Sequence, residues 1–103
     1  MLEKNDLNQM VMKLADNQFL YKLDDSLMWL FNIESGEHYD LNESSFFVLS
    51  LLDGKKTIDE IRQLYLEHYA ESGVAEEVLL KDFNTLIHNL IDSRVVTLKK
   101  QFA

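Results

Sequence analysis

Residues 27–36, LMWLFNIESG, contain the pattern from which the fold is most directly predicted. Leu27–Phe31 is a short continuous apolar run, which is typical of a central strand that is packed on both faces. The Ser35-Gly36 pair that follows has the composition of a tight hairpin turn, because glycine adopts a positive φ without steric cost. The segment therefore predicts a strand that ends in a tight reversal of the chain.

The segments on either side predict two further strands. Residues 19–24, FLYKLD, alternate apolar and polar side chains for most of their length, as in a half-buried strand, and residues 24–26, DDS, have turn chemistry. After the hairpin turn, Glu37–Leu41 alternates polar and apolar residues, so we expect Tyr39 and Leu41 to face inward. Together the segments predict a three-stranded antiparallel meander.

The second half of the chain has helical signals. Asn42 is a good N-cap for a first helix, and Gly54 is placed to end it. Thr57 and Glu60 have the spacing of a capping box. In this motif the Thr hydroxyl and the Glu carboxylate each accept a hydrogen bond from a backbone N–H that the helix leaves unpaired. A second helix is therefore expected to begin after Thr57 and to end at Gly73.

A third helix is predicted from about Ala75 to Asp92, with apolar residues over more than one stripe of its surface. Val95, Val96 and Leu98 indicate a short extended tail after it. Three strands followed by three helices resemble a winged helix-turn-helix arrangement. We therefore predict an α+β fold in which a three-stranded antiparallel sheet is followed by three helices.

The length of 103 residues is that of one domain. We expect this domain over residues 19–98, with an N-terminal extension at 1–18 and a short tail at 99–103. Within the extension, Val11–Leu14 is compatible with a helix or with a strand, and the sequence leaves both open.

Composition excludes several classes of function. The chain has a formal net charge of −8, which argues against nucleic-acid binding, because that binding depends on cationic contacts to phosphate. Cysteine is absent, so thiol catalysis and thiolate metal sites are excluded. No run of 18 apolar residues is present, and we expect a cytoplasmic protein without membrane contact.

Catalytic and metal-binding signatures are also missing. His38, His68 and His88 are far apart in sequence, and no two have the i, i+4 spacing of a helical metal site. The sequence contains no glycine-rich phosphate loop and no nucleophile elbow. We predict no catalytic residues, no metal site and no cofactor; a metal site or hydrolase would require the three histidines to converge in the fold.

A protein-binding surface is the remaining candidate. The last strand of a meander leaves backbone N–H and C=O groups that an extended peptide can pair with. Four carboxylates and no lysine or arginine occupy residues 34–43: Glu34, Glu37, Asp40 and Glu43. These charges have two compatible interpretations: they protect a free edge from aggregation, or they attract a cationic peptide to it.

Three segments of the chain are similar to a known family. Residues 27–42 resemble its hairpin pattern L.N..TG..Y.LN, and residues 51–61, LLDGKKTIDEI, resemble its LLDG..T..EI segment. Residues 82–96 follow its closing pattern, DV..FL..L…GLI, except that Arg94 stands where the family usually has glycine. The family is that of the PqqD-like proteins, peptide chaperones that are also called RiPP recognition elements, RiPPs being ribosomally made peptides that enzymes modify afterwards.

This resemblance implies a non-catalytic module that binds the leader segment of a precursor peptide and presents it to a modifying enzyme, such as a radical SAM enzyme or cyclase, or to a leader peptidase. The leader would add as a strand beside the third strand and lie between that strand and the third helix. The implied contact residues are Glu37, His38, Tyr39, Asp40 and Leu41 on the strand, and Leu80, Asn84, Ile87, His88 and Ile91 on the helix. The alternatives are a winged-helix transcription regulator and a generic protein-interaction domain.

Overall fold

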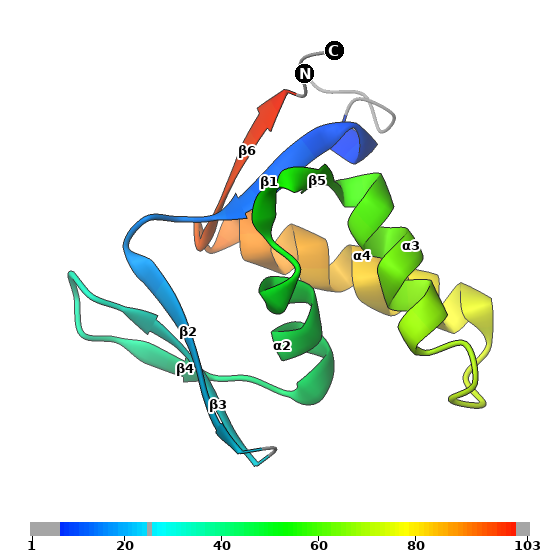
Figure 1. The fold of residues 1–103 in the computed structure, drawn as a ribbon, viewed down its shortest axis with the longest axis horizontal. Coiled ribbons are helices and arrows are strands. Elements are labelled where there is room, and N and C mark those ends of the chain that lie inside the picture. Colours follow the sequence, from blue (N-terminus) through cyan, green and yellow to red (C-terminus); the bar gives the residue numbers. More distant parts are fainter. Residues whose placement is uncertain (1–6, 25, 101–103) are drawn as a thin grey trace.

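The computed structural model describes residues 7–24 and 26–100, which fold into helices and strands arranged as two antiparallel sheets packed with the helices (Figure 1). In chain order the elements are β1 (Met10–Leu14), β2 (Gln18–Asp24), β3 (Leu27–Asn32), β4 (His38–Asp40), α2 (Glu43–Ser50), β5 (Asp53–Thr57), α3 (Ile58–His68), α4 (Glu76–Asp92) and β6 (Val96–Lys100). The α+β class is confirmed. The expected order of one sheet followed by helices is too simple, because β1, β5 and β6 form a second sheet.

The first sheet, which we call the hairpin sheet, has the strand order β2-β3-β4 and contains the three strands predicted from the sequence. The side chain of Asn32 builds its tight turn by accepting hydrogen bonds from the N–H groups of Glu34 (2.9 Å) and Ser35 (3.2 Å). Gly36 has a φ of 77° there, as its place in the turn predicts. At the other turn, Asp24 accepts a bond from the N–H of Ser26 at 2.8 Å. Asp25, between them, lies outside the described residues.

The second sheet, which we call the terminal sheet, has the order β5-β1-β6. It decides the alternative that the sequence left open, since Val11–Leu14 belongs to strand β1. It also overturns the expectation for Gly54: the first helix ends earlier, at Ser50, and Gly54, with a φ of 76°, lies within β5. The residues after α2 pair with β1 instead of forming a simple helix-to-helix turn.

The helix starts agree with the sequence signals. Asn42 caps α2 by accepting a hydrogen bond from the N–H of Ser45 at 2.8 Å. Thr57 and Glu60 form the predicted capping box at the start of α3. This helix ends at His68, so the prediction that Gly73 ends it is wrong, and Gly73 lies in the loop before α4.

The core lies where α2, α3 and α4 meet β1 and β3. Five side chains from four of these elements are almost completely buried: Met12, Val48, Ile58, Ile61 and Phe83. From α4, Leu79, Phe83, Ile87 and Leu90 are buried, so much of the apolar surplus of this helix is core. Within residues 7–24 and 26–100, no helix combines the length and the apolar character that crossing a membrane requires.

Strand β3 is buried on one face and not on both, as the apolar run had suggested. Met28 and Leu30 are buried against the helices, whereas Phe31 is 37% exposed on the opposite face. Tyr39 is also misjudged by the sequence pattern: it pairs with Leu30 and therefore lies on the helix side of the sheet, but it is 51% exposed. Its strand is at the edge of the sheet, where fewer neighbours cover it.

Arg94 adopts the left-handed conformation with a φ of 62°, directly after Ser93, the C-cap residue of α4. A side chain in this conformation is disfavoured by roughly 1–2 kcal/mol. We expect Arg94→Gly to stabilise the protein by about 1 kcal/mol, since the greater freedom of glycine in the unfolded chain offsets part of the gain. The midpoint temperature of thermal unfolding, Tm, should then rise by about 4–8 °C. Arg94→Ala removes the same charge but keeps the strain, and an equal rise in that variant would contradict the explanation.

Candidate functional site

The free edge of β4 is the first component of the candidate site. Among the described residues β4 pairs only with β3, in the register Trp29↔Asp40, Leu30↔Tyr39 and Phe31↔His38. Within residues 7–24 and 26–100, no strand lies beside its other edge. The strand that the sequence analysis proposed for peptide pairing is therefore at the margin of the sheet.

The hydrogen bonds of the hairpin identify which backbone groups face this free edge. The carbonyl of Glu37 accepts from the N–H of Asn32 and the N–H of Leu41 donates to Met28, both at 2.9 Å. In an antiparallel pair, alternate residues direct both backbone groups to the partner strand. The N–H and C=O groups of His38 and Asp40 therefore point away from β3 and can pair with an added strand.

Side chains of β4 divide between the two faces of the sheet. Tyr39 lies on the helix side, and its hydroxyl donates a hydrogen bond to the carboxylate of Glu37 at 3.2 Å. This bond to a carboxylate raises the pKa of Tyr39 above its ordinary value. Leu41 is half-buried against the core. His38 and Asp40 lie on the opposite face, beside Phe31 and Trp29.

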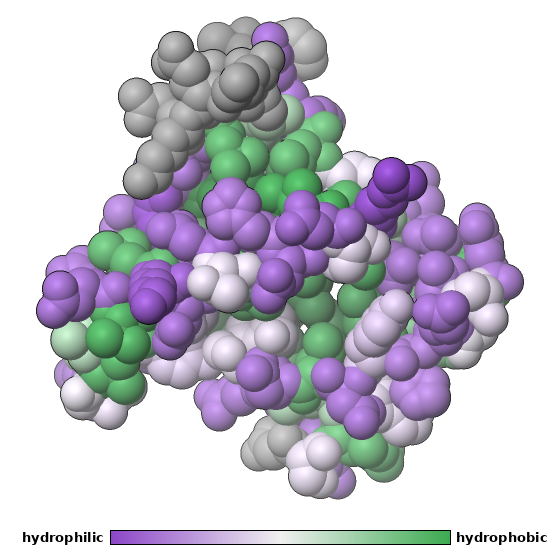
Figure 2. Space-filling view, turned by 180° about the vertical axis from the view of Figure 1, so that it is seen from behind, coloured by the Kyte–Doolittle hydropathy of each residue, from purple (hydrophilic) through white to green (hydrophobic). Residues whose placement is uncertain are grey.

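A hollow of about 300 Å³ lies next to the end of β4, between the start of α2 and one flank of α4. We call it the α2–α4 hollow; its lining is Asn42, Ser44, Ser45, Tyr65, Asp82, Thr85, Leu86 and Asn89. Seen from behind, the surface is also indented between the hairpin sheet and the centre of the molecule, with hydrophobic side chains in the indentation (Figure 2). A chain that pairs with β4 has room to continue over α4.

The α4 residues expected from the sequence do not line this hollow. Successive helical residues are rotated by about 100°, so the expected set lies on the flank opposite to that of Leu86 and Asn89. Ile87 is only 3% exposed and belongs to the core. Asn84 and His88 are exposed, and Leu80 and Ile91 are half-buried. The sequence analysis had no signal for the hollow, because only the fold places the start of α2 against α4.

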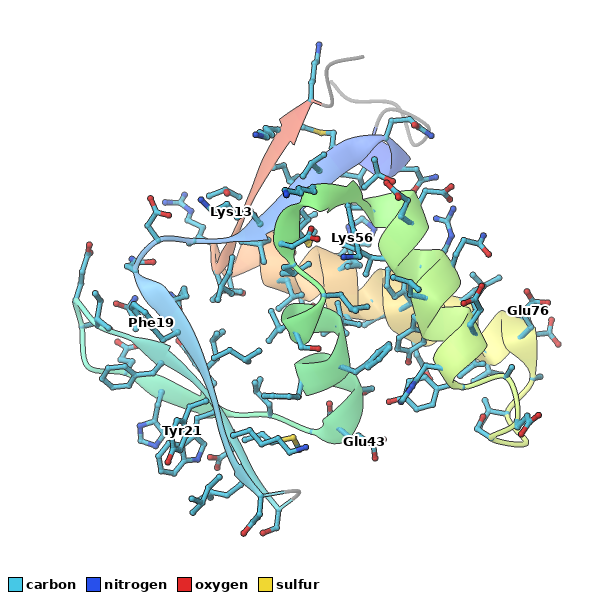
Figure 3. All side chains as sticks on the ribbon, in the orientation of Figure 1. Lys13, Phe19, Tyr21, Glu43, Lys56 and Glu76 are labelled. Atoms are coloured by element: carbon cyan, nitrogen blue, oxygen red, sulfur yellow. The ribbon has the colours of Figure 1, made fainter. Side chains whose placement is uncertain are left out.

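Negative charge surrounds the strand and the hollow. Glu37 and Asp40 lie at the strand, Asp82 lines the hollow, and Glu43 is at the start of α2, where Figure 3 labels it. The lining of the hollow includes no lysine or arginine. The electrostatic character of the site therefore favours a cationic ligand.

The three histidines occupy separate environments. His38 packs against Trp29 with a ring separation of 5.4 Å, and His68 stacks on Phe47 at 4.0 Å. His88 is exposed on α4. In the part of the chain that the structure describes, no group of three or more metal-binding side chains is close enough to hold an ion. The alternative that required the histidines to converge has no support from this arrangement.

Comparisons with known proteins give two matches. The family model described as coenzyme PQQ synthesis protein D (PqqD) matches residues 28–96, from β3 to the first residue of β6. Among solved structures, the chain is similar to TbiB1 in complex with the TbiA(beta) leader peptide. The TM-score is 0.65 and the identity 20%, over 88% of this chain and 98% of that chain, which shows a common fold. The search of the curated proteins found no match.

Proposed function

The chain belongs to the PqqD family, and on this premise we propose that it is a non-catalytic protein that recognises the leader segment of a ribosomally synthesised precursor peptide. It binds the leader by strand addition to β4 and presents it to a modifying enzyme or a leader peptidase. The observation that carries the proposal is the edge of β4 with which no described strand pairs, beside the α2–α4 hollow. The similar protein TbiB1 was solved with a leader peptide, which supports this assignment.

The outward backbone groups of His38 and Asp40 allow four hydrogen bonds to an added strand. At roughly 0.5–1.5 kcal/mol net for each bond, pairing contributes a few kcal/mol. Ordering a flexible leader costs about 2–5 kcal/mol or more, and a micromolar complex requires about −8 kcal/mol. Backbone pairing alone is therefore insufficient. Side chains of the leader must bury apolar surface beside Tyr39 and against Tyr65 and Leu86, the two lining residues of the α2–α4 hollow with large apolar side chains.

The recognition domain is proposed to include more of the chain than residues 19–98. Strand β1 pairs with both β5 and β6, and β6 reaches Lys100, so we assign residues 10–100 to one unit. We propose that its arrangement is of the winged helix-turn-helix type. A transcription regulator is disfavoured because α4 has Lys81 as its single basic residue beside four acidic ones. We place this function in the cytoplasm, where ribosomes make the precursor.

The direct test is a titration of the full chain with synthetic leaders of candidate precursor peptides taken from neighbouring reading frames. We expect a complex in the micromolar range by calorimetry, with the largest amide shifts in the NMR spectrum at His38 and Asp40. These groups lose water and gain a strand partner. Absence of binding at millimolar leader would refute the proposed function.

Salt dependence tests the role of the acidic residues around β4. Surface charges are screened over about 10 Å at 0.1 M salt, so a cationic leader should bind several-fold more weakly at 0.5 M than at 0.05 M. Most of the change should be in the association rate. Calorimetry and stopped-flow fluorescence at the two salt concentrations measure it. Equal association rates would show that these charges do not attract the leader.

A further inference from the structure

The face of the hairpin sheet that is turned away from the helices carries a group of exposed aromatic side chains. Phe19 pairs with Phe31 and Tyr21 with Trp29, which places the four rings on one face. Phe19 is 52% exposed and Tyr21 is 47% exposed, and Figure 3 shows both on the side of the sheet away from the helices. We call this surface the outer aromatic face; it comprises Phe19, Tyr21, Trp29 and Phe31, with the exposed Leu23 and Ile33 at its margins.

The rings of this face are already packed against one another. Trp29 lies between Tyr21, at a ring separation of 5.7 Å, and His38, at 5.4 Å. Side chains that hold each other in place lose little freedom when a partner covers them. Aromatic residues in such an arrangement are typical of the centre of a protein interface.

The outer aromatic face has the size of the largest apolar patch on a typical monomer. With large side chains of about 150–250 Å² each, the observed exposures correspond to on the order of 500 Å² of apolar surface. A typical monomer has its largest apolar patch at about 300–600 Å², and such patches often bind a partner. The core of the domain does not require these side chains, because Met28 and Leu30 supply the buried face of β3.

The charges at this face specify the chemistry of the partner. Asp40 pairs with Trp29 and so lies on the same face, and Asp24 and Glu34 are exposed at the ends of the strands. Lys22, the basic residue of the described hairpin sheet, pairs with the buried Met28 and so lies on the opposite face. A complementary surface is therefore apolar at its centre and has lysine or arginine at its border.

From these observations we propose that the outer aromatic face is the docking surface for the enzyme that receives the bound leader. The inference rests on the proposed function. A leader strand beside β4 widens the same sheet, so an enzyme on the outer aromatic face contacts the protein next to the leader without covering its edge. Strand β3 separates the leader from Phe19 and Tyr21. A second copy is a poor occupant, because it would bring together acidic borders of two chains, each with a net charge of −8.

The test uses a purified candidate modifying enzyme or leader peptidase from a neighbouring reading frame, together with the leader. Phe19→Lys/Tyr21→Lys reverses the apolar and acidic character of the face, at positions that are about half exposed. We expect the affinity for the enzyme to fall at least about 30-fold, as for central interface residues, while leader affinity stays within about twofold. Val74→Lys, at a 45% exposed site in the loop before α4, is the matched control and should leave both affinities unchanged.

Several results would overturn the docking proposal. These are an unchanged enzyme affinity in the double variant, an equal loss in Val74→Lys, or a loss of leader affinity alone. A dimer in light scattering that the double variant dissociates would assign the face to a second copy, and binding to phosphatidylglycerol vesicles would assign it to a membrane. If circular dichroism shows that the double variant is unfolded, the enzyme affinity of the single variant Ile33→Lys, at the margin of the face, decides whether the docking proposal holds. Failure of the wild-type protein to bind leader, with enzyme binding intact, refutes the proposed function and not the docking surface.

Discussion

Asp40→Pro is expected to weaken leader binding at least tenfold, with the fold retained. The N–H of Asp40 points away from β3, so its loss leaves the hairpin sheet paired as before, and proline is accepted on edge strands at such positions. The added leader strand, in contrast, loses the N–H of Asp40 as a hydrogen-bond donor, and the leader carbonyl that accepted from it is left without a partner. An unsatisfied group of this kind costs roughly 1–3 kcal/mol, and the proline ring also obstructs the approach of the leader. Calorimetric titration with the leader measures the effect.

Asp40→Asn is the matched control for this variant. It removes the same charge but keeps the backbone N–H, so only the electrostatic attraction should change, by a few-fold at low salt. If Asp40→Pro binds the leader as tightly as the wild-type protein, with native circular dichroism, the leader does not pair with β4. An equal loss in Asp40→Asn would assign the effect to charge and contradict strand addition as its cause.

Asn89→Trp is the second variant with a large expected effect. Asn89 is exposed and lines the α2–α4 hollow, so an indole there fills space that the leader is proposed to use. Losing the burial of one or two leader side chains, at about 1.5–3 kcal/mol each, corresponds to at least a tenfold decrease in affinity. The backbone carbonyl of Asn89, which accepts bonds from Ser93, is unchanged by the substitution.

Asn84→Trp makes the same substitution on the opposite flank of α4, which the sequence analysis had selected. Asn84 is also exposed, so both variants should fold. We expect Asn84→Trp to bind the leader normally in the same titration. The reverse result, with Asn84→Trp weakened and Asn89→Trp normal, would show that the leader follows the flank of Leu80 and Ile91.

Features that depend on neighbouring residues were predictable from the sequence. The turn at Gly36, the cap at Asn42 and the capping box at Thr57 and Glu60 are each satisfied within a few residues, and all are present in the structure. The strand that forms the candidate edge was predicted for the same reason, since its turn fixes its register with β3.

Features that depend on distant partners were not predictable. Gly54 has a positive φ, which suits a helix end as well as a turn into a strand, and only β1 decides between them. Alternation identified β2 but not which side faces the core, and Phe19 and Tyr21 prove to be outside. On α4 the buried stripe was visible, whereas both flanks are partly apolar, with Leu80 on one and Leu86 on the other. Which of the two flanks of α4 lies beside β4 is determined by the position of the start of α2, which the sequence alone does not give.

The terminal sheet has a consequence for the order of events during synthesis. Strand β1 is its middle member, and Met10 pairs with Lys100, so two of the most widely separated segments of the chain are neighbours. Contacts of such long range form late, whereas the hairpins around β3 close locally and early. On the ribosome, the edge of β4 would therefore take shape before the body that supports it, which becomes complete only after β6 has left the exit tunnel.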